Sequence, residues 1–198
     1  MCGICGEFKF TKDSFDSIKL DNLMTSISMR GKDSKGRYLD NDIFLGHHRL
    51  SIIDISDKSN QPMRIGNYVI VFNGVIFNYP LIKKNLEKKG HTFKSTGDTE
   101  VIIRSYIEYG SECVKHLDGV FAFCIYDIEK KVIFLARDRI GIKPLYYHID
   151  NNQISFSSHM KGIIKNMKIK EIDPIALNYQ FTLHSVVPAP HTIIKNIK

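Results

Sequence analysis

Met1-Cys2-Gly3-Ile4-Cys5-Gly6 opens the chain and places a cysteine one residue from the N-terminus. A side chain this small behind Met1 is accepted by methionine aminopeptidase, so we expect Met1 to be removed. Cys2 then carries a thiol and a free α-amine on one residue. This amine has an unperturbed pKa of about 7.7 to 8.0, so it can take the thiol proton near neutral pH. The stretch therefore predicts a nucleophile that brings its own general base.

The same stretch has two other interpretations, because Cys2 and Cys5 form a C-x-x-C pair. Such a pair is half of a zinc site or a redox dithiol. A zinc site needs further ligands, and the two other cysteines, Cys113 and Cys124, stand alone. A thioredoxin-like pair follows a strand, whereas this one starts the chain. We therefore expect no metal site here.

Composition indicates one ordinary domain. The 198 residues are 43% hydrophobic and 25% charged, enough to build a substantial core. No apolar run approaches the roughly 20 residues of a membrane helix, and residues 1–30 lack the pattern of a signal peptide. Four cysteines without a disulfide spacing fit a reducing compartment. These features predict a cytoplasmic protein that does not bind membranes.

The net charge of +7 raises the question of nucleic-acid binding. The lysines are spread along the whole chain, and the small clusters at 83–84 and 88–89 fit the solvent face of a helix. A nucleic-acid site is typically a dense basic block with interleaved aromatic residues. The distribution therefore favours no nucleic-acid partner.

The first half of the sequence predicts strands and helices in groups. Strands are expected at 2–8, 43–53 and 68–72, and helices at 16–29, 79–89 and from Gly97 to Gly110. In the first helix, Ile18, Leu23, Met24 and Ile27 are expected to be buried. Residues 30–36 predict a polar loop. Asn73-Gly74 predicts a turn that ends its strand, and Asp98 is placed at a helix N-cap.

The second half predicts a hairpin of strands 117–127 and 131–138, strands near 145–149 and 153–157, and helices near 160–165 and after Asp173. Grouped rather than alternating elements indicate an α+β fold with antiparallel sheets. Several strands are apolar almost throughout, so both of their faces must be covered. The simplest solution is two stacked sheets with helices outside, in one domain over 1–198.

Four residues at strand ends or helix starts suit a common chemistry. Arg49 has the fork geometry that binds a carboxylate with two hydrogen bonds. The Asn73 amide and the Gly74 backbone N–H would form an oxyanion hole. Asp98 would accept hydrogen bonds from an ammonium group. Together with the cysteine, these residues suggest an α-amino acid as substrate.

Each of these residues also has a structural interpretation. Asn-Gly after a strand is most often a turn, a leading Asp is most often a cap, and Arg49 would pair with any carboxylate. His47 and His48 are adjacent in a strand and point to opposite faces, so they cannot share a metal. Their joint occurrence, rather than any single residue, favours a site.

The ordered motifs of the chain resemble the glutaminase domain of glutamine-dependent asparagine synthetases. They run through essentially the whole sequence and resemble asparagine synthetases more than other class II amidotransferases. The motifs are Met1-Cys2-Gly3-Ile4, Arg30-Gly31-x-Asp33-x-x-Gly36, Gly46-His47-x-Arg49-Leu50-Ser51-Ile52-Ile53-Asp54, Gln61-Pro62-Met63, Phe72-Asn73-Gly74, Gly97-Asp98-Thr99-Glu100, Leu117-Asp118-Gly119, Ala136-Arg137-Asp138-Arg139 and Lys143-Pro144-Leu145-Tyr146-Tyr147.

This resemblance implies an N-terminal-nucleophile hydrolase fold, a four-layer αββα sandwich with two antiparallel sheets. It implies that Cys2 attacks glutamine, that Asn73 and Gly74 hold the oxyanion, and that Arg49 and Asp98 bind the substrate carboxylate and amine. Leu50 and Ile52 are expected to shape the pocket.

The resemblance implies no cofactor for this domain, and ATP and magnesium only for a synthetase domain. Glutamine is the expected substrate. The expected partner is a synthetase domain, in the same chain or in another one, and a homodimer is possible in this family.

The sequence departs from the family at Val75, where an acidic residue usually helps to hold the substrate amine. The loss of one anionic partner is expected to weaken glutamine binding by roughly 1 to 3 kcal/mol. The Ser-Gly-Gly-x-Asp-Ser loop of the synthetase domain does not occur in these residues, so this chain is not expected to make asparagine unaided. The alternative function is a degenerate scaffold or binding module without turnover, for which Val75 is the main argument.

Overall fold

The computed structural model describes residues 1–198 and contains two antiparallel sheets. The first sheet has five strands in the order β2-β3-β1-β9-β8, so the N-terminal strand lies at its centre. Its strands are β1 (Gly3–Lys9), β2 (Ser34–Leu39), β3 (Ile43–Arg49), β8 (Tyr146–Ile149) and β9 (Gln153–Ser157).

The second sheet has four strands in the order β4-β5-β6-β7. Its strands are β4 (Met63–Ile65), β5 (Tyr68–Ile76), β6 (Gly119–Asp127) and β7 (Val132–Arg137). The strand β4 pairs only with residues 68–70 of β5, so the rest of that β5 edge has no neighbouring strand. This open edge lies in the segment that carries Asn73 and Gly74.

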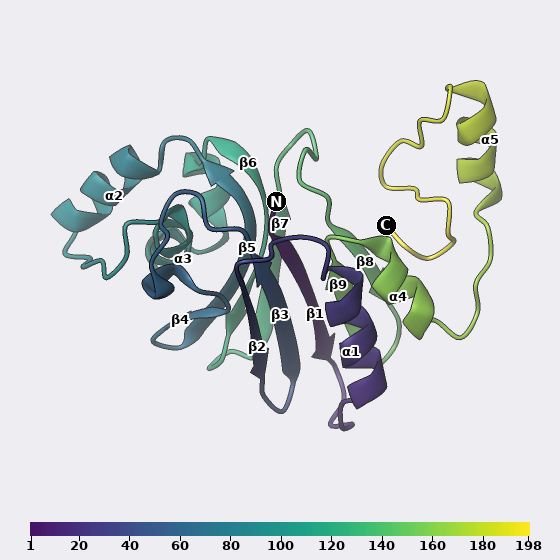
Figure 1. Cartoon of the computed structure of the whole chain (residues 1–198), viewed down its shortest axis with the longest axis horizontal. Coiled ribbons are helices and arrows are strands. Elements are labelled where there is room, and N and C mark those ends of the chain that lie inside the picture. The colour runs from purple at the N-terminus through teal and green to yellow at the C-terminus, as the bar shows by residue number, and fades with distance from the viewer.

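Helices cover the outer face of each sheet (Figure 1). The helices α2 (Tyr79–Lys88) and α3 (Asp98–Tyr109) lie over the four-stranded sheet, and α1 (Ser17–Ser26) and α4 (Met160–Asn166) lie over the five-stranded sheet. The helix α5 (Pro174–Thr182) lies beyond α4, and two short 3₁₀ helices span Asp57–Ser59 and Gly110–His116. The expected αββα sandwich is confirmed.

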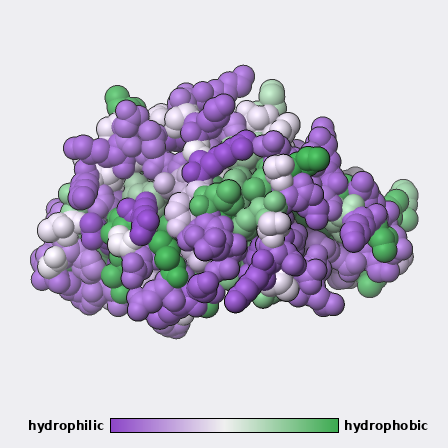
Figure 2. Space-filling view, turned by 90° about the horizontal axis from the view of Figure 1, so that it is seen from below, coloured by the Kyte–Doolittle hydropathy of each residue, from purple (hydrophilic) through white to green (hydrophobic).

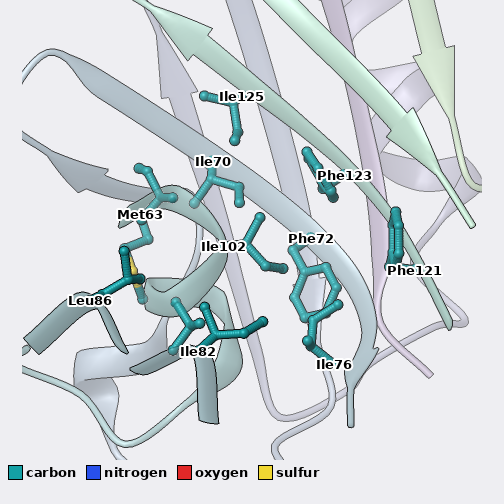
Figure 3. Close-up of a cluster of buried hydrophobic side chains, with 12 residues drawn as sticks. Met63, Ile70, Phe72, Ile76, Ile82, Leu86, Ile102, Phe121, Phe123 and Ile125 are labelled. Atoms are coloured by element: carbon teal, nitrogen blue, oxygen red, sulfur yellow. The ribbon is translucent and has the colours of Figure 1, made fainter. Parts of the chain in front are cut away.

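Three separate apolar clusters fill the three spaces between these four layers. One joins the four-stranded sheet to α2 and α3, and Figure 3 shows Ile70, Phe72 and Ile76 of β5 within it. The second lies between the sheets and includes Val69 and Val71 of the same strand. Alternate β5 side chains thus face opposite layers. An apolar strand is stable here because both faces are covered.

The surface is mostly hydrophilic, with apolar side chains in separate patches on the face shown in Figure 2. None of the helices combines the length and the apolar character needed to cross a membrane. The four cysteines are free, and Cys5 is a fully buried residue whose sulfur lies 3.8 Å from Met24 Sδ. Cys5 is therefore a core residue.

The structure corrects two predictions near the candidate site. Asn73-Gly74 is not a turn: β5 continues to Ile76, and both residues pair with β6. The turn signal failed because the backbones pack too closely for a side chain at Gly74, where a Cβ would collide with the Val120 carbonyl. Asp98 is not the cap of α3, since Gly97 holds that position and the Asp98 carboxylate binds Ile76 N.

Two further predictions were wrong in detail. Residues 30–36 are not wholly a loop, because β2 begins at Ser34 as an edge strand beside β3. In α1, Ile18 is 72% exposed, and Leu20 is buried in its place together with Leu23 and Met24. The helix begins only at Ser17, after an Asp16 cap, so Ile18 falls on the solvent side of its first turn.

Candidate active site

Strand alternation aims the predicted site residues into one space. In β1, Ile4 belongs to the cluster between the sheets, and Cys2, two residues earlier, points to the same face. In β3, Ile43 and Leu45 face the same cluster, which places Arg49 on that face. In β5, Asn73 follows Val69 and Val71. Cys2, Arg49 and Asn73, the predicted nucleophile, carboxylate-binding residue and oxyanion donor, therefore converge although they come from different sheets.

A small pocket of about 90 Å³ collects all eight of the predicted site residues. It lies between the ends of the two sheets and is closed by the segment after β3 and the start of α3. The pocket is lined by Met1, Cys2, Arg49, Leu50, Ile52, Ile53, Asp54, Ser59, Gln61, Phe72, Asn73, Gly74, Val75, Gly97, Asp98, Thr99 and Lys143.

The Cys2 thiol is held by the backbone of Leu50. The Leu50 N–H donates to Sγ over 3.3 Å, and the Leu50 carbonyl lies 3.6 Å from Sγ. Burial raises the pKa of Cys2, and the Leu50 N–H and the positive charge of the chain terminus oppose that rise. Arg30 Nε donates to the Cys2 carbonyl over 2.8 Å. Cys2 is therefore fixed through its side chain and its backbone.

The open edge of β5 carries the predicted oxyanion donors. Asn73 is 1% exposed, and its Nδ2 group has no hydrogen-bond partner in the protein. A buried, unpartnered donor of this kind is costly unless it serves a ligand. The N–H groups of Phe72 and Ile76 bind side chains on this edge, so register directs the Gly74 N–H the same way. Two donors thus face the pocket.

Arg49 keeps part of its hydrogen-bonding capacity for a ligand. Its Nη1 donates to the Ser56 carbonyl at 2.9 Å and to Asn60 Oδ1 at 2.7 Å, and its Nη2 donates to the Asp54 carbonyl. A guanidinium has five N–H donors, so about two remain, on Nε and Nη2. Two adjacent donors fit a carboxylate.

The loop that receives Arg49 is itself fixed by Asp54. Its carboxylate accepts hydrogen bonds from Ser56, Ser59 and Thr96, and these hold the pKa of Asp54 well below its ordinary value although burial opposes them. This negative charge persists at neutral pH and orders the loop. The carboxylate end of the pocket is therefore rigid.

Asp98 is a buried carboxylate with one backbone partner outside its own helix, the Ile76 N–H at 3.1 Å. Burial raises the pKa of Asp98 to about 6 despite the hydrogen bonds that it accepts. Val75 lines the same pocket and is only partly buried. An ammonium group entering here would find one carboxylate and an apolar neighbour.

Leu50 and Ile52 contribute to the pocket in different ways. Leu50 binds the thiol through its backbone, whereas the Ile52 side chain is 68% exposed where it lines the pocket. Sequence reasoning did not assign site roles to Gln61, Thr99 or Lys143, which also line the pocket. Each of the three lies within a motif, namely Gln61-Pro62-Met63, Gly97-Asp98-Thr99 or Lys143-Pro144-Leu145. These motifs were the one sequence feature that could have indicated a place in the pocket.

Comparison with known proteins identifies the family of the chain. The family model of the glutamine amidotransferase domain matches residues 1–198. The chain belongs to this family. The glutamine amidotransferase domain described here is 40% identical over 205 residues to asparagine synthetase (glutamine-hydrolyzing) 1 of Bacillus subtilis, covering 100% of this chain and 32% of that protein. It is 35% identical over 204 residues to asparagine synthetase (glutamine-hydrolyzing) 3 of the same organism, covering 100% and 33%.

A solved structure supports the fold of this amidotransferase domain. Glutamine phosphoribosylpyrophosphate amidotransferase from B. subtilis superimposes with a TM-score of 0.68 at 18% identity, covering 88% of this chain and 46% of that chain. The expected N-terminal-nucleophile hydrolase fold is confirmed. The chain spans between 32% and 42% of the length of three curated relatives that it matches.

Proposed function

We propose that the chain hydrolyses glutamine to glutamate and ammonia through a thioester on Cys2. The observation that carries the proposal is the buried Asn73 Nδ2 group, which has no partner and lines the same pocket as the Cys2 thiol. Arg49 and Asp98 line that pocket too, with two spare N–H donors and one carboxylate. These groups complement the two ends of a free α-amino acid.

Met1 lines the pocket in the unprocessed chain. Its Sδ atom lies 3.5 Å from Lys143 Nζ and 4.0 Å from Arg30 Nη2. Removal of Met1 takes this side chain away from the pocket and gives Cys2 a free α-amine. The same processing step therefore makes room for the substrate and creates the general base.

The reaction proceeds in two displacements. The α-amine of Cys2 takes the thiol proton, and Sγ attacks the side-chain amide carbon of glutamine while Asn73 Nδ2 and the Gly74 N–H stabilise the oxyanion. The amine returns the proton to the amide nitrogen, the C–N bond breaks, and ammonia leaves. Water then attacks the thioester, the C–S bond breaks, and glutamate and the thiol are released.

We further propose that the ammonia serves an ATP-dependent synthetase domain that makes asparagine, in the same chain or as a partner. The support is the identity to relatives named as glutamine-hydrolyzing asparagine synthetases, of which this chain spans a third to two fifths. Hydrolysis in this domain needs no cofactor. We place the reaction in the cytoplasm, where free thiols such as these four persist.

Intact mass and covalent labelling test the hydrolysis. A diazoketone analogue of glutamine is expected to add one adduct to a chain that starts at Cys2. The Cys2→Ala variant is expected to lose glutamate release by at least about 10³-fold while keeping its fold by circular dichroism. A chain that retains Met1 and stays unlabelled, or full activity in Cys2→Ala, contradicts the proposal.

The second candidate is a scaffold that keeps the fold without turnover, and Val75 favours it because the amine end has only one carboxylate. Calorimetric titration of the processed protein with glutamine separates the two functions. A scaffold gives no heat of binding and no glutamate. The hydrolase gives both.

A further inference from the structure

The backbone of Phe72 lies on the open edge of β5, directly before the oxyanion residues, and side chains replace the missing strand there. The Phe72 N–H donates to Gln61 Oε1 at 2.6 Å. Its carbonyl faces His47 Nε2 at 3.1 Å. The N–H and the carbonyl of Phe72 are therefore both bound by side chains that come from outside the four-stranded sheet.

Gln61 is itself held from two directions. It is 8% exposed, and its Nε2 group donates to Thr99 Oγ1 at 3.1 Å. Thr99 follows Asp98 in α3, so Gln61 connects the amine side of the pocket to the oxyanion strand. On its other side, Gly36 of β2 approaches the Gln61 backbone so closely that a Cβ would collide with the Gln61 carbonyl. The Gln61 backbone and its side-chain amide are therefore both held in place.

His47 reaches Phe72 from the five-stranded sheet. It is fully buried and lies two residues before Arg49 in β3. Burial lowers the pKa of His47 to about 3, so the ring is neutral. A carbonyl oxygen faces Nε2, which assigns the ring proton to that atom. His47 therefore donates across the space between the sheets and ties the strand of Arg49 to the strand of Asn73.

We propose that Gln61 and His47 are positioning residues that clamp the backbone of Phe72. The clamp thereby holds the Asn73 amide and the Gly74 N–H in place on the pocket wall that faces the Cys2 thiol. The inference rests on the proposed glutamine hydrolysis. Neither side chain is assigned a contact with the reacting atoms. They act through the two peptide groups on either side of the Phe72 Cα: Gln61 binds the N–H of the first, and His47 binds the carbonyl of the second, which is bonded to the Asn73 nitrogen.

The clamp predicts a loss in kcat rather than in KM. Ground-state glutamine is bound at its carboxylate and its amine, whereas the oxyanion exists only in the transition state and the intermediate. Displaced donors therefore slow the chemical step and leave substrate affinity in place. We expect kcat to fall about 10- to 100-fold and KM to change less than about 3-fold.

Gln61→Met and His47→Met remove the two hydrogen bonds to Phe72 with little change in volume, and Gln61→Met also removes the bond to Thr99 Oγ1. His47→Gln keeps a donor near the position of Nε2 and is expected to recover most of the kcat lost in His47→Met. Thr192→Val is the matched control, because it removes a buried hydroxyl that shares its one proton between the Ile194 and Ile197 carbonyls, away from the pocket. Its kcat is expected to stay within about 2-fold of the parent.

Each variant is measured as the processed full chain for kcat, KM and melting temperature. Selective loss of kcat at Gln61 and His47, with recovery in His47→Gln, supports the clamp. Equal kcat in Gln61→Met and Thr192→Val, or a rise in KM without loss of kcat, overturns it. If Gln61→Met does not fold, the pair His47→Met and His47→Gln decides. Failure of the proposed hydrolysis differs, because the parent chain itself then releases no glutamate.

Discussion

Two charged side chains of the pocket, Arg49 and Asp98, are held in very different ways. Arg49 is fixed by three oxygen acceptors on a loop that Asp54 orders through Ser56, Ser59 and Thr96. Asp98 has the Ile76 N–H, the Val75 side chain as a pocket neighbour and a raised pKa. In the proposed hydrolase, a rigidly held guanidinium would face the substrate carboxylate, and a carboxylate that titrates near pH 6 would face its amine.

This difference indicates how recognition is divided. A preorganised guanidinium loses little entropy on binding, so in the proposed hydrolase we expect Arg49 to orient the substrate through its carboxylate. We expect Asp98 to contribute less at the amine end, because its pKa of about 6 leaves the carboxylate partly protonated near that pH. Three variants or conditions test this division.

The largest effect is expected from Arg49→Lys. A lysine keeps the charge but has three donors on one nitrogen, so it cannot serve the loop acceptors and a bidentate substrate carboxylate together. We expect kcat/KM to fall about 10²-fold in steady-state glutaminase assays. A change below about 3-fold would mean that charge alone suffices and that the rigid network has no role in recognition.

The pH dependence of KM is expected to have an intermediate effect, set by Asp98. Its pKa of about 6 means that the carboxylate is charged at pH 7.5 and increasingly neutral below pH 6. The substrate amine stays protonated throughout this range, so attraction is lost as the pH falls. We expect KM to rise about 10-fold from pH 7.5 to 5.

Asp98→Asn is the control for this assignment. It is expected to show a raised KM that no longer depends on pH between 7.5 and 5. A pH dependence that persists unchanged in Asp98→Asn would assign the titration to another group.

The smallest effect is expected from Val75→Glu, which adds a second carboxylate beside Asp98. We expect KM for glutamine to fall by up to about 10-fold at pH 7.5, with kcat nearly unchanged. Val75→Gln is the matched control, since it adds a polar side chain of similar size without charge. Equal KM values in the two variants would remove charge from the explanation.

The sequence predicted the layered fold and the pocket residues because both depend on local patterns. Apolar strands such as 68–72 indicated stacked sheets, and the motifs named Cys2 and Arg49. It did not predict that β5 runs through Asn73-Gly74, since a turn signal gives no information about a neighbouring strand.

The clamp was missed for the same physical reason. Gln61 and His47 lie 11 and 25 residues from Phe72, and they meet it through backbone groups. The Gln-Pro-Met motif was visible in the sequence, but its contact was not. These contacts form because β4 ends before it reaches Phe72 and leaves that edge of β5 open. No residue type in the sequence specifies where β4 ends.

The three-residue length of β4 has a consequence for association between molecules. A strand edge with free N–H and C=O groups is a template on which another chain can add a strand, and such edges lead to aggregation. Here Gln61 and His47 bind the edge groups of Phe72, and Asp98 binds the edge N–H of Ile76. They close the edge to a foreign strand on both sides of Gly74, which lines the pocket.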